Sequence, residues 1–310
     1  MHQDFEKFAA RAAPVIFVVL WSTGFIGTKY VLHNAEPLTY LAIRMALVVG
    51  LMAVIVAIAR PQWPNWPGVG HSVVAGILVH GFYLGGTAIA IAHSIPAGLS
   101  ALIPGLQPIL TSTLANRWLG ERVTPLQWTG LLLGLAGVVL ILHDRPISGD
   151  AGWGWLASVV SLVSITLGTL YQRRYSGHID WRAGNLVQYV AVMIFFAAAA
   201  FLFESNEVHW TAEFMLSVAW LAVVLSIGSI GRWYWLIRRR AATSVASLFY
   251  LVPAVTAAMA YVLFGERLDA VAVSGMVACA AAVFLVNRRA QVSRFNASKP
   301  GQRPTVENHP

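Results

Sequence analysis

Charged side chains are scarce in this sequence. Asp, Glu, Lys and Arg together make up 11% of its 310 residues, whereas soluble globular proteins carry about 25%. Hydrophobic residues make up 57% of the chain, which leaves too little polar surface to cover a soluble fold. The composition therefore excludes an ordinary soluble domain and predicts an all-α polytopic membrane protein whose surroundings are the lipid bilayer.

Cysteine and the common catalytic motifs are also missing. The single cysteine, Cys279, excludes an internal disulfide and lies inside an apolar run, where it serves as a small packing residue. The sequence has no P-loop, HExxH, GxSxG or CxxC pattern. We therefore expect no catalytic residues, no metal and no cofactor, and a protein that is not an enzyme.

The positive charges are arranged as membrane topology requires. The net charge is +8, but the basic residues lie in short loops between apolar runs rather than in one patch, so we expect no nucleic-acid partner. With the N-terminus inside, the basic loop residues outside are Lys29, Arg145 and Arg267, and most of the others lie inside. This bias predicts that both termini are cytoplasmic.

Long apolar runs fill most of the chain. A membrane-spanning helix needs about 20 apolar residues, and ten segments meet that requirement, joined by short gaps with breaker residues. No gap is long enough for a soluble domain. The predicted spans are 14–32, 37–59, 69–92, 96–117, 124–143, 153–172, 181–203, 213–236, 241–263 and 268–287.

One unit of this chain occurs twice. Residues 97–142 and 242–286 each contain an apolar run with a proline, a Gly-Glu-Arg turn and a second apolar run. At a constant offset of 145 residues, the matched positions are Pro108 and Pro253, Gly130 and Gly275, and the turns at 120–122 and 265–267. Because five spans is an odd number, the second half must insert upside down relative to the first.

The predicted organisation is therefore two inverted five-helix repeats. Inverted repeats underlie many secondary transporters, which bind substrate near the midplane where the halves meet. The predicted parts are a cytoplasmic segment 1–13, a first repeat 14–143, an outer linker 144–152, a second repeat 153–287 and a cytoplasmic disordered tail 288–310. A duplicated chain can form this site alone, so we expect a monomer.

The chain resembles the drug/metabolite transporter superfamily, in its ten-helix EamA branch, over about residues 14–287. The resemblance is carried by the run WSTGFIGTK at 21–29, by Pro37 and Arg44, and by the paired prolines and Gly-Glu turns. It implies EamA-type repeats and export of small metabolites, often amino acids or related compounds, across a bacterial inner membrane without ATP. The alternative is a non-transporting membrane protein that handles lipid or acts as a scaffold.

No predicted span contains Asp or Glu in its interior. Proton-coupled transporters often use a buried carboxylate, so the commonest coupling group is absent here. His80 is the well-buried residue that titrates near neutral pH. It is either a proton carrier or a hydrogen-bonded polar residue, and a facilitator or a substrate-driven exchanger is equally consistent with the sequence.

Several polar and aromatic residues are candidates for a central pathway. Arg44 lies about 10 Å below the outer end of its span, so it either attracts an anion in a cavity or snorkels to the surface. Tyr83 shares a helical face with His80, and Gln188 lies on a similar polar stripe. Trp21 is deeper than the interfacial tryptophans and is a candidate pocket residue.

Prolines mark the same place in both halves. Pro104 and Pro108 interrupt the fourth predicted span and Pro253 the ninth, and each proline removes a backbone donor and frees a carbonyl. Such breaks are tolerated in lipid where other helices or a cavity meet the freed groups. The prolines therefore indicate either a pathway, with Gln107 beside it, or a packing kink.

Overall fold

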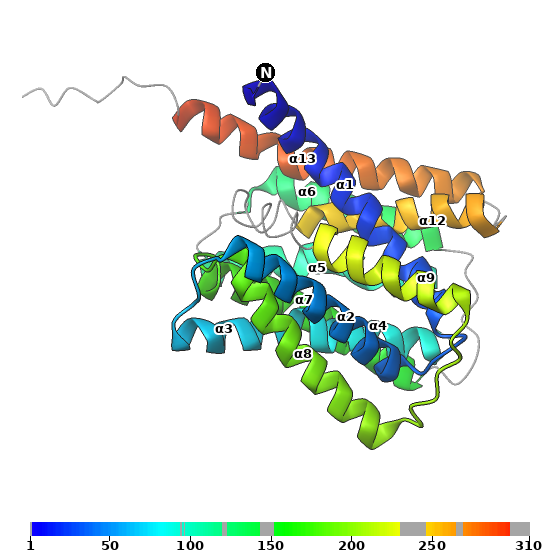
Figure 1. Cartoon of the computed structure of the whole chain (residues 1–310). Helices are drawn as coiled ribbons and strands as arrows, with labels where there is room; N and C mark the ends of the chain where they lie inside the picture. Colours follow the sequence, from blue (N-terminus) through cyan, green and yellow to red (C-terminus); the bar gives the residue numbers. More distant parts are fainter. Residues whose placement is uncertain are drawn as a thin grey trace, which may run out of the picture.

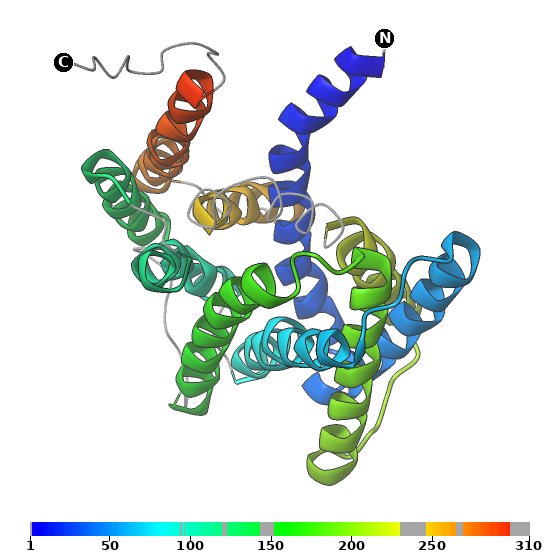
Figure 2. The same ribbon diagram turned by 90° about the vertical axis from the view of Figure 1, so that its left-hand side faces the viewer.

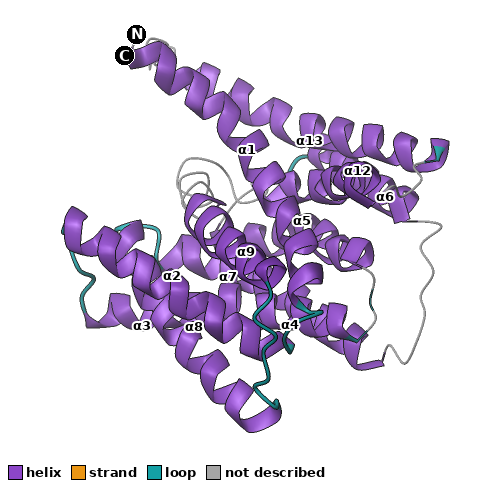
Figure 3. Cartoon of the chain, turned by 45° about the vertical axis from the view of Figure 1, so that its right-hand side comes forward, coloured by secondary structure: helices purple, strands orange, loops and turns teal. Residues whose placement is uncertain are grey.

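The computed structural model is built of helices. It describes residues 2–93, 95, 97–119, 123–142, 152–229, 246–264 and 269–297. Within those residues the chain forms helices and connecting turns, with one isolated antiparallel bridge between Ala35 and Val208 (Figure 3). The all-α fold is thus confirmed for the described part of the chain.

The helices follow the predicted spans closely. Five helical stretches, one of them the composite Trp66–Ala92, are long and apolar enough to cross a membrane, and further apolar helices are shorter. The first half contains α1 (His2–Val31), α2 (Pro37–Ala59), α3 (Trp66–Gly76), η1 (Ile77–Phe82), α4 (Tyr83–Ala92), α5 (Ala97–Leu119) and α6 (Pro125–Leu142). The second half contains α7 (Gly152–Tyr175), α8 (Trp181–Phe203), α9 (Ala212–Trp220), η2 (Leu221–Ser229), η3 (Ser247–Tyr250), α12 (Leu251–Phe264) and α13 (Ala270–Ala297).

Some predicted spans are built from consecutive helical pieces. The third span is α3, η1 and α4 in series, and the ninth is η3 followed by α12. The eighth combines α9 with η2, and the rest of that predicted span, 230–236, is outside the described residues. Both η1 and η2 are π-helical, whereas η3 is a 3₁₀ turn just before Pro253. That tighter turn lies where the proline removes a helical donor.

The first and last helices extend beyond the predicted spans. Helix α1 begins at His2 and runs through Pro14, and α13 continues to Ala297. The tail predicted from residue 288 therefore begins as helix rather than as disordered chain. An α-helix forms its backbone hydrogen bonds within itself, so it can continue beyond the apolar zone of the membrane. The Arg, Ala and Gln residues of these segments are also good helix formers.

Local signals explain several helix starts. Pro37 occupies the first turn of α2, where its missing N–H is not needed. The Asn65 side chain accepts a hydrogen bond from Gly68 N at the start of α3, and Thr211 caps α9 in the same way. These caps fix where each helix begins after a short loop.

The helices pair in a pattern that repeats between the halves. The fifth and tenth spans, α6 and α13, pack together, as do the second and seventh, α2 and α8. These two pairs lie on opposite sides of the molecule (Figures 1 and 2). Helix α1 packs on α9, η2 and α12, and its counterpart α7 packs on α3, η1, α4 and α5. The packing of α1 against the second half thus corresponds to the packing of α7 against the first half.

The contact between α6 and α13 shows the inverted relation at residue level. A Cβ on Gly275 would lie 2.5 Å from Gly137 O, and one on Gly130 would lie 3.2 Å from Ala282 O. An offset of 145 residues converts the first pair into the second. Between them Cys279 Sγ lies 3.7 Å from Gly134 O. Residue numbers fall along α6 as they rise along α13 in these contacts, so the two helices are antiparallel and are related by a local twofold axis.

Two loops are joined by reciprocal carboxylate contacts, which we call the loop clasp. Glu204, after α8, accepts hydrogen bonds from the backbone N–H groups of Leu38 and Thr39, at 2.8 and 2.7 Å. Glu36, before α2, accepts from Ser205 N and Oγ, at 2.8 and 2.7 Å. The loop clasp, made of these five residues, fixes the ends of α2 and α8 against each other.

Some sequence features lie outside the described residues. These are both Gly-Glu-Arg turns, Arg232 and residues 144–151 of the outer linker predicted at 144–152. The start of α1 and the end of α13 lie at the same end of the molecule (Figures 1 and 3), which is the arrangement that an even number of spans produces.

Candidate functional site

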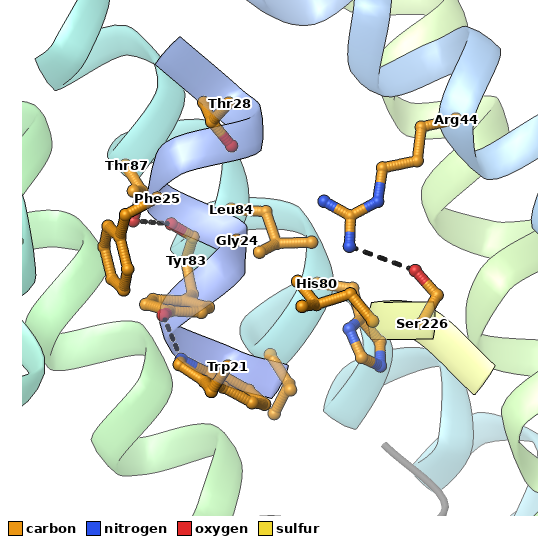
Figure 4. Close-up of a pocket in the computed structure, with 12 residues that line it drawn as sticks. Trp21, Gly24, Phe25, Thr28, Arg44, His80, Tyr83, Leu84, Thr87 and Ser226 are labelled. Carbon is orange, nitrogen blue, oxygen red and sulfur yellow. Dashed lines mark hydrogen bonds between the residues drawn. The ribbon is translucent and has the colours of Figure 1, made fainter. Parts of the chain in front are cut away.

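A small cavity lies where helices of both halves meet. The first half contributes α1, α2, η1 and α4, and the second half contributes η2. Its volume of about 40 Å³ holds only a few water molecules, since one water needs roughly 10–15 Å³ of such space. The lining residues are Trp21, Gly24, Phe25, Thr28, Arg44, Val79, His80, Tyr83, Leu84, Thr87, Leu225 and Ser226 (Figure 4).

Arg44 is the charged group of this cavity. Its side chain is only 3% exposed, so it does not reach the surface as a snorkelling arginine would. Its Nη2 donates to Ser226 Oγ at 3.0 Å, whereas its Nε has no hydrogen-bond partner. No carboxylate among the described residues pairs with it. The cavity therefore holds a buried cation with an unused donor.

The neighbours of Arg44 are neutral hydroxyl groups. Tyr40, Tyr83 and Tyr189 lie close enough to interact with its charge. Tyr189 Oη donates to Ser226 O at 2.7 Å. This bond positions Ser226, whose hydroxyl accepts the hydrogen bond from Arg44. Hydroxyl dipoles of this kind orient a guanidinium without neutralising it, so the site keeps its positive charge.

His80, on π-helical η1, lies near Arg44 of α2. Its ring centroid is 4.8 Å from that of Tyr189, and the Gln188 side chain is near enough to interact with the imidazole. The His80 Nε2 atom is buried without a hydrogen-bond partner among the described residues. Two predicted residues, His80 and Gln188, therefore meet next to Arg44, and His80 reaches the cavity itself.

Aromatic side chains form the opposite wall. Trp21 stacks on Tyr83 with ring centroids 6.1 Å apart, and Trp21 Nε1 donates to Tyr83 Oη at 3.1 Å. Phe249 packs edge-on against Trp21 at 5.2 Å. Figure 4 shows Trp21, Tyr83 and Phe25 across the cavity from Arg44 and Ser226. One wall is thus cationic and polar, and the other is aromatic.

The remaining predicted residues lie elsewhere. Gln107 on α5 is buried and donates from Nε2 to Thr169 Oγ1 at 3.2 Å, but it does not line the cavity. Pro253 is buried on α12, where the neighbouring Val252 O accepts a hydrogen bond from Ser22 Oγ at 3.3 Å. Pro104 lies within α5, and its side chain is outside the described residues. Gln107 and Pro253 therefore lie outside the lining of the Arg44 cavity.

Ser226 was not foreseen as a site residue. It is a single hydroxyl in the apolar run 221–227, which reads as an ordinary packing residue in a sequence. The structure places it on η2, the counterpart of η1 in the other half. Both π-helical turns thus present a polar side chain to one cavity. π-helical turns occur frequently at functional sites, but no sequence period reveals them.

Comparison with known proteins gives the family. Residues 12–143 and 152–288 each match the EamA-like transporter family. The uncharacterized transporter YvbV of Bacillus subtilis is 28% identical over 90% of this chain and 92% of its own. A probable amino-acid metabolite efflux pump of Escherichia coli is 28% identical over 85% of this chain and 89% of its own.

Two further likenesses extend over nearly the whole chain. A probable terminal-alkyne amino-acid exporter of Streptantibioticus cattleyicolor is 28% identical over 94% of this chain and 97% of its own. A solved crystal structure superposes with a TM-score of 0.74 at 20% identity, covering 92% of this chain and 98% of that one. The latter supports the fold alone.

Proposed function

Because this chain belongs to the EamA-like transporter family, we propose that it exports a small metabolite, an amino acid or a related compound, by alternating access at the Arg44 cavity. The observation that carries the proposal is Arg44 itself. A buried arginine without a carboxylate partner is expensive to keep in a membrane protein, and such residues commonly mark substrate pathways.

The make-up of the cavity supports alternating access. Four elements of the first half and one of the second enclose it, so relative movement of the halves would open it. Its volume of about 40 Å³ is far below the roughly 300–1,000 Å³ of typical small-molecule pockets. We therefore interpret this structure as a contracted form that must widen before a metabolite enters.

The names of relatives support the class of cargo. Two of them are named for amino-acid export, one as an efflux pump and one as an exporter. We propose that residues 14–143 and 153–287 act as the two moving halves, in a bacterial inner membrane with both termini in the cytoplasm. We also propose a monomer, since both walls of the cavity come from one chain.

Transport in proteoliposomes tests this function. Purified protein would be assayed for efflux against a pool of amino acids and other metabolites, with and without a pH gradient. We expect the wild type to transport some member of the pool and Arg44→Ala to lose that transport. If the wild type transports no member of the pool, the result would favour a non-transporting membrane protein.

A further inference from the structure

We propose that the Arg44 cavity selects organic carboxylates that carry an aromatic or apolar body and no free ammonium group. Acylated or deaminated amino-acid derivatives belong to this class, and zwitterionic amino acids do not. The inference rests on the proposed function and narrows its substrate. It follows from three properties of the cavity, namely its charge, its unused donor and its aromatic wall.

The charge of the cavity is positive and uncompensated. Among the lining residues Arg44 is the one with a permanent charge, and none is Asp or Glu. All acidic residues of the chain fall in loops, tails or span ends, so no span can bring a carboxylate to this site from its interior. A substrate carboxylate would supply the missing counter-charge, whereas a substrate ammonium would face Arg44 with no anion to balance it.

The donors of Arg44 match a carboxylate. A guanidinium has five N–H donors in a planar fork, and it binds carboxylates through two parallel hydrogen bonds. In this structure Arg44 Nη2 donates to Ser226 Oγ, and Arg44 Nε is buried without a hydrogen-bond partner. An anion bound at the Nε edge would satisfy that donor while leaving the contact with Ser226 in place.

Acceptors that could hold an ammonium group are already used. Tyr83 O accepts from both Thr87 Oγ1 and Ser161 Oγ, each at 2.9 Å. The Thr28 hydroxyl is paired with Tyr40 Oη at 3.3 Å, and Ser226 Oγ donates to Leu221 O at 3.2 Å. Among the lining groups this leaves the Arg44 Nε donor for an anion and His80 Nε2 as the other atom without a partner. His80 lies within the electrostatic reach of Arg44, so a cation at that nitrogen would be repelled by the guanidinium.

The facing wall fits a flat or apolar body. Trp21, Phe25 and Tyr83 present aromatic surface, with Val79, Leu84 and Leu225 around them. A substrate with its carboxylate on Arg44 would direct its other end toward this wall, as the arrangement in Figure 4 shows. Burial of apolar substrate surface there would favour binding.

Three compounds with one ring and different charge test the inference. N-acetyl-L-phenylalanine is an anion, L-phenylalanine a zwitterion and phenethylamine a cation. In proteoliposomes at equal concentrations, we expect at least tenfold more protein-dependent flux of the anion than of either other compound. Arg44→Gln should remove that flux, whereas Arg60→Gln, which removes an exposed charge outside the cavity, should leave it within twofold.

A binding measurement covers the case in which a variant folds poorly. N-acetyl-L-phenylalanine should raise the melting temperature of the detergent-solubilised wild type and of Arg60→Gln, because a ligand that binds only the folded state stabilises it. It should not raise that of Arg44→Gln. Ser226→Ala keeps the charge and should retain selectivity for the anion.

The outcomes separate this inference from the proposed function. Equal or greater flux of L-phenylalanine would overturn the inference while confirming transport. If other members of the metabolite pool are transported and none of the three ring compounds is, the inference is overturned but the proposed transport function is not. No flux of any compound tested would overturn the proposed function and this inference together.

Discussion

Arg44 places a charge inside the protein at a cost in stability. On insertion scales an arginine in the middle of a membrane helix costs about 2.5–3.5 kcal/mol. Here that cost is offset by hydroxyl groups, and within the described part of the chain no carboxylate contributes. A residue kept only for packing would not need this charge, since a methionine fills similar space without desolvating a guanidinium.

Replacing Arg44 by Met separates the two roles. We expect Arg44→Met to melt at the wild-type temperature or above, with a gain of up to about 1–3 kcal/mol, because the uncompensated buried charge disappears. Transport should fall at least tenfold in the same protein. Thermal unfolding in detergent and efflux from proteoliposomes measure these two quantities. A variant that melts lower than the wild type would instead identify Arg44 as a structural residue.

The Trp21–Tyr83 contact is a second single-residue test. Tyr83→Phe would remove the hydroxyl that accepts the hydrogen bond from Trp21 Nε1, and we expect a loss of about 0.5–1.5 kcal/mol in unfolding free energy. Trp21→Phe removes the donor itself. Since both changes break one hydrogen bond, the double variant should be destabilised by less than the sum of the single variants. Additive effects would show that the bond contributes nothing to stability.

At the scale of helices, the α6–α13 pair depends on close backbone contact. A Cβ on Gly275 would lie 2.5 Å from Gly137 O and 2.9 Å from Ile141 N, and backbone atoms cannot move aside. Gly275→Ala should therefore destabilise the protein by about 1–3 kcal/mol through overpacking.

A matched control for Gly275→Ala lies on α2. A Cβ on Gly50 would meet nothing within 4 Å, so Gly50→Ala should stabilise the protein by roughly 0.5–1 kcal/mol through helix propensity alone. Thermal unfolding of both variants in the same detergent decides the comparison. Equal effects of the two substitutions would mean that α6 and α13 are not held at this distance.

The positions of the helices follow from the sequence, but their internal irregularities do not. Runs of apolar residues and breakers such as Pro37 define the spans, because a bilayer demands a helix of fixed length wherever the chain enters it. The π-helical turns η1 and η2 arise from packing between helices, which leaves no period in the sequence. Ser226 was missed for that reason, and Gln107 was grouped with a cavity that it does not line.

Four of the residues singled out in the sequence lie around one cavity, but the sequence does not give their geometry. Trp21, Arg44, His80 and Tyr83 all line it, and for Arg44 and His80 this follows because ionisable groups in apolar spans almost always face the protein interior. Their mutual distances depend on how α1, α2 and η1 cross. Such crossings are set by close packing at positions such as Gly76, where a Cβ would lie 2.8 Å from Gln188 Cβ.

At the scale of the whole molecule, the inverted relation fixes where the two Gly-Glu-Arg turns must lie. Each turn immediately precedes one of the two helices that pair about the local twofold axis, α6 and α13. Antiparallel helices begin at opposite ends of their contact, as the pairing of Gly137 with Gly275 and of Gly130 with Ala282 requires. We therefore predict that the two turns lie on opposite faces of the membrane.

Cysteine labelling measures this placement directly. In a Cys279→Ala background, Glu121→Cys and Glu266→Cys would each carry one accessible thiol, since the natural cysteine is buried. The bias of Lys and Arg predicts that the first turn is cytoplasmic and the second is outside. A membrane-impermeant maleimide should thus label the Glu266→Cys variant in intact cells, and the Glu121→Cys variant only after the membrane is opened. Labelling of both variants in intact cells would contradict the inverted arrangement, whereas the reverse pattern would preserve it and show that the termini face outward.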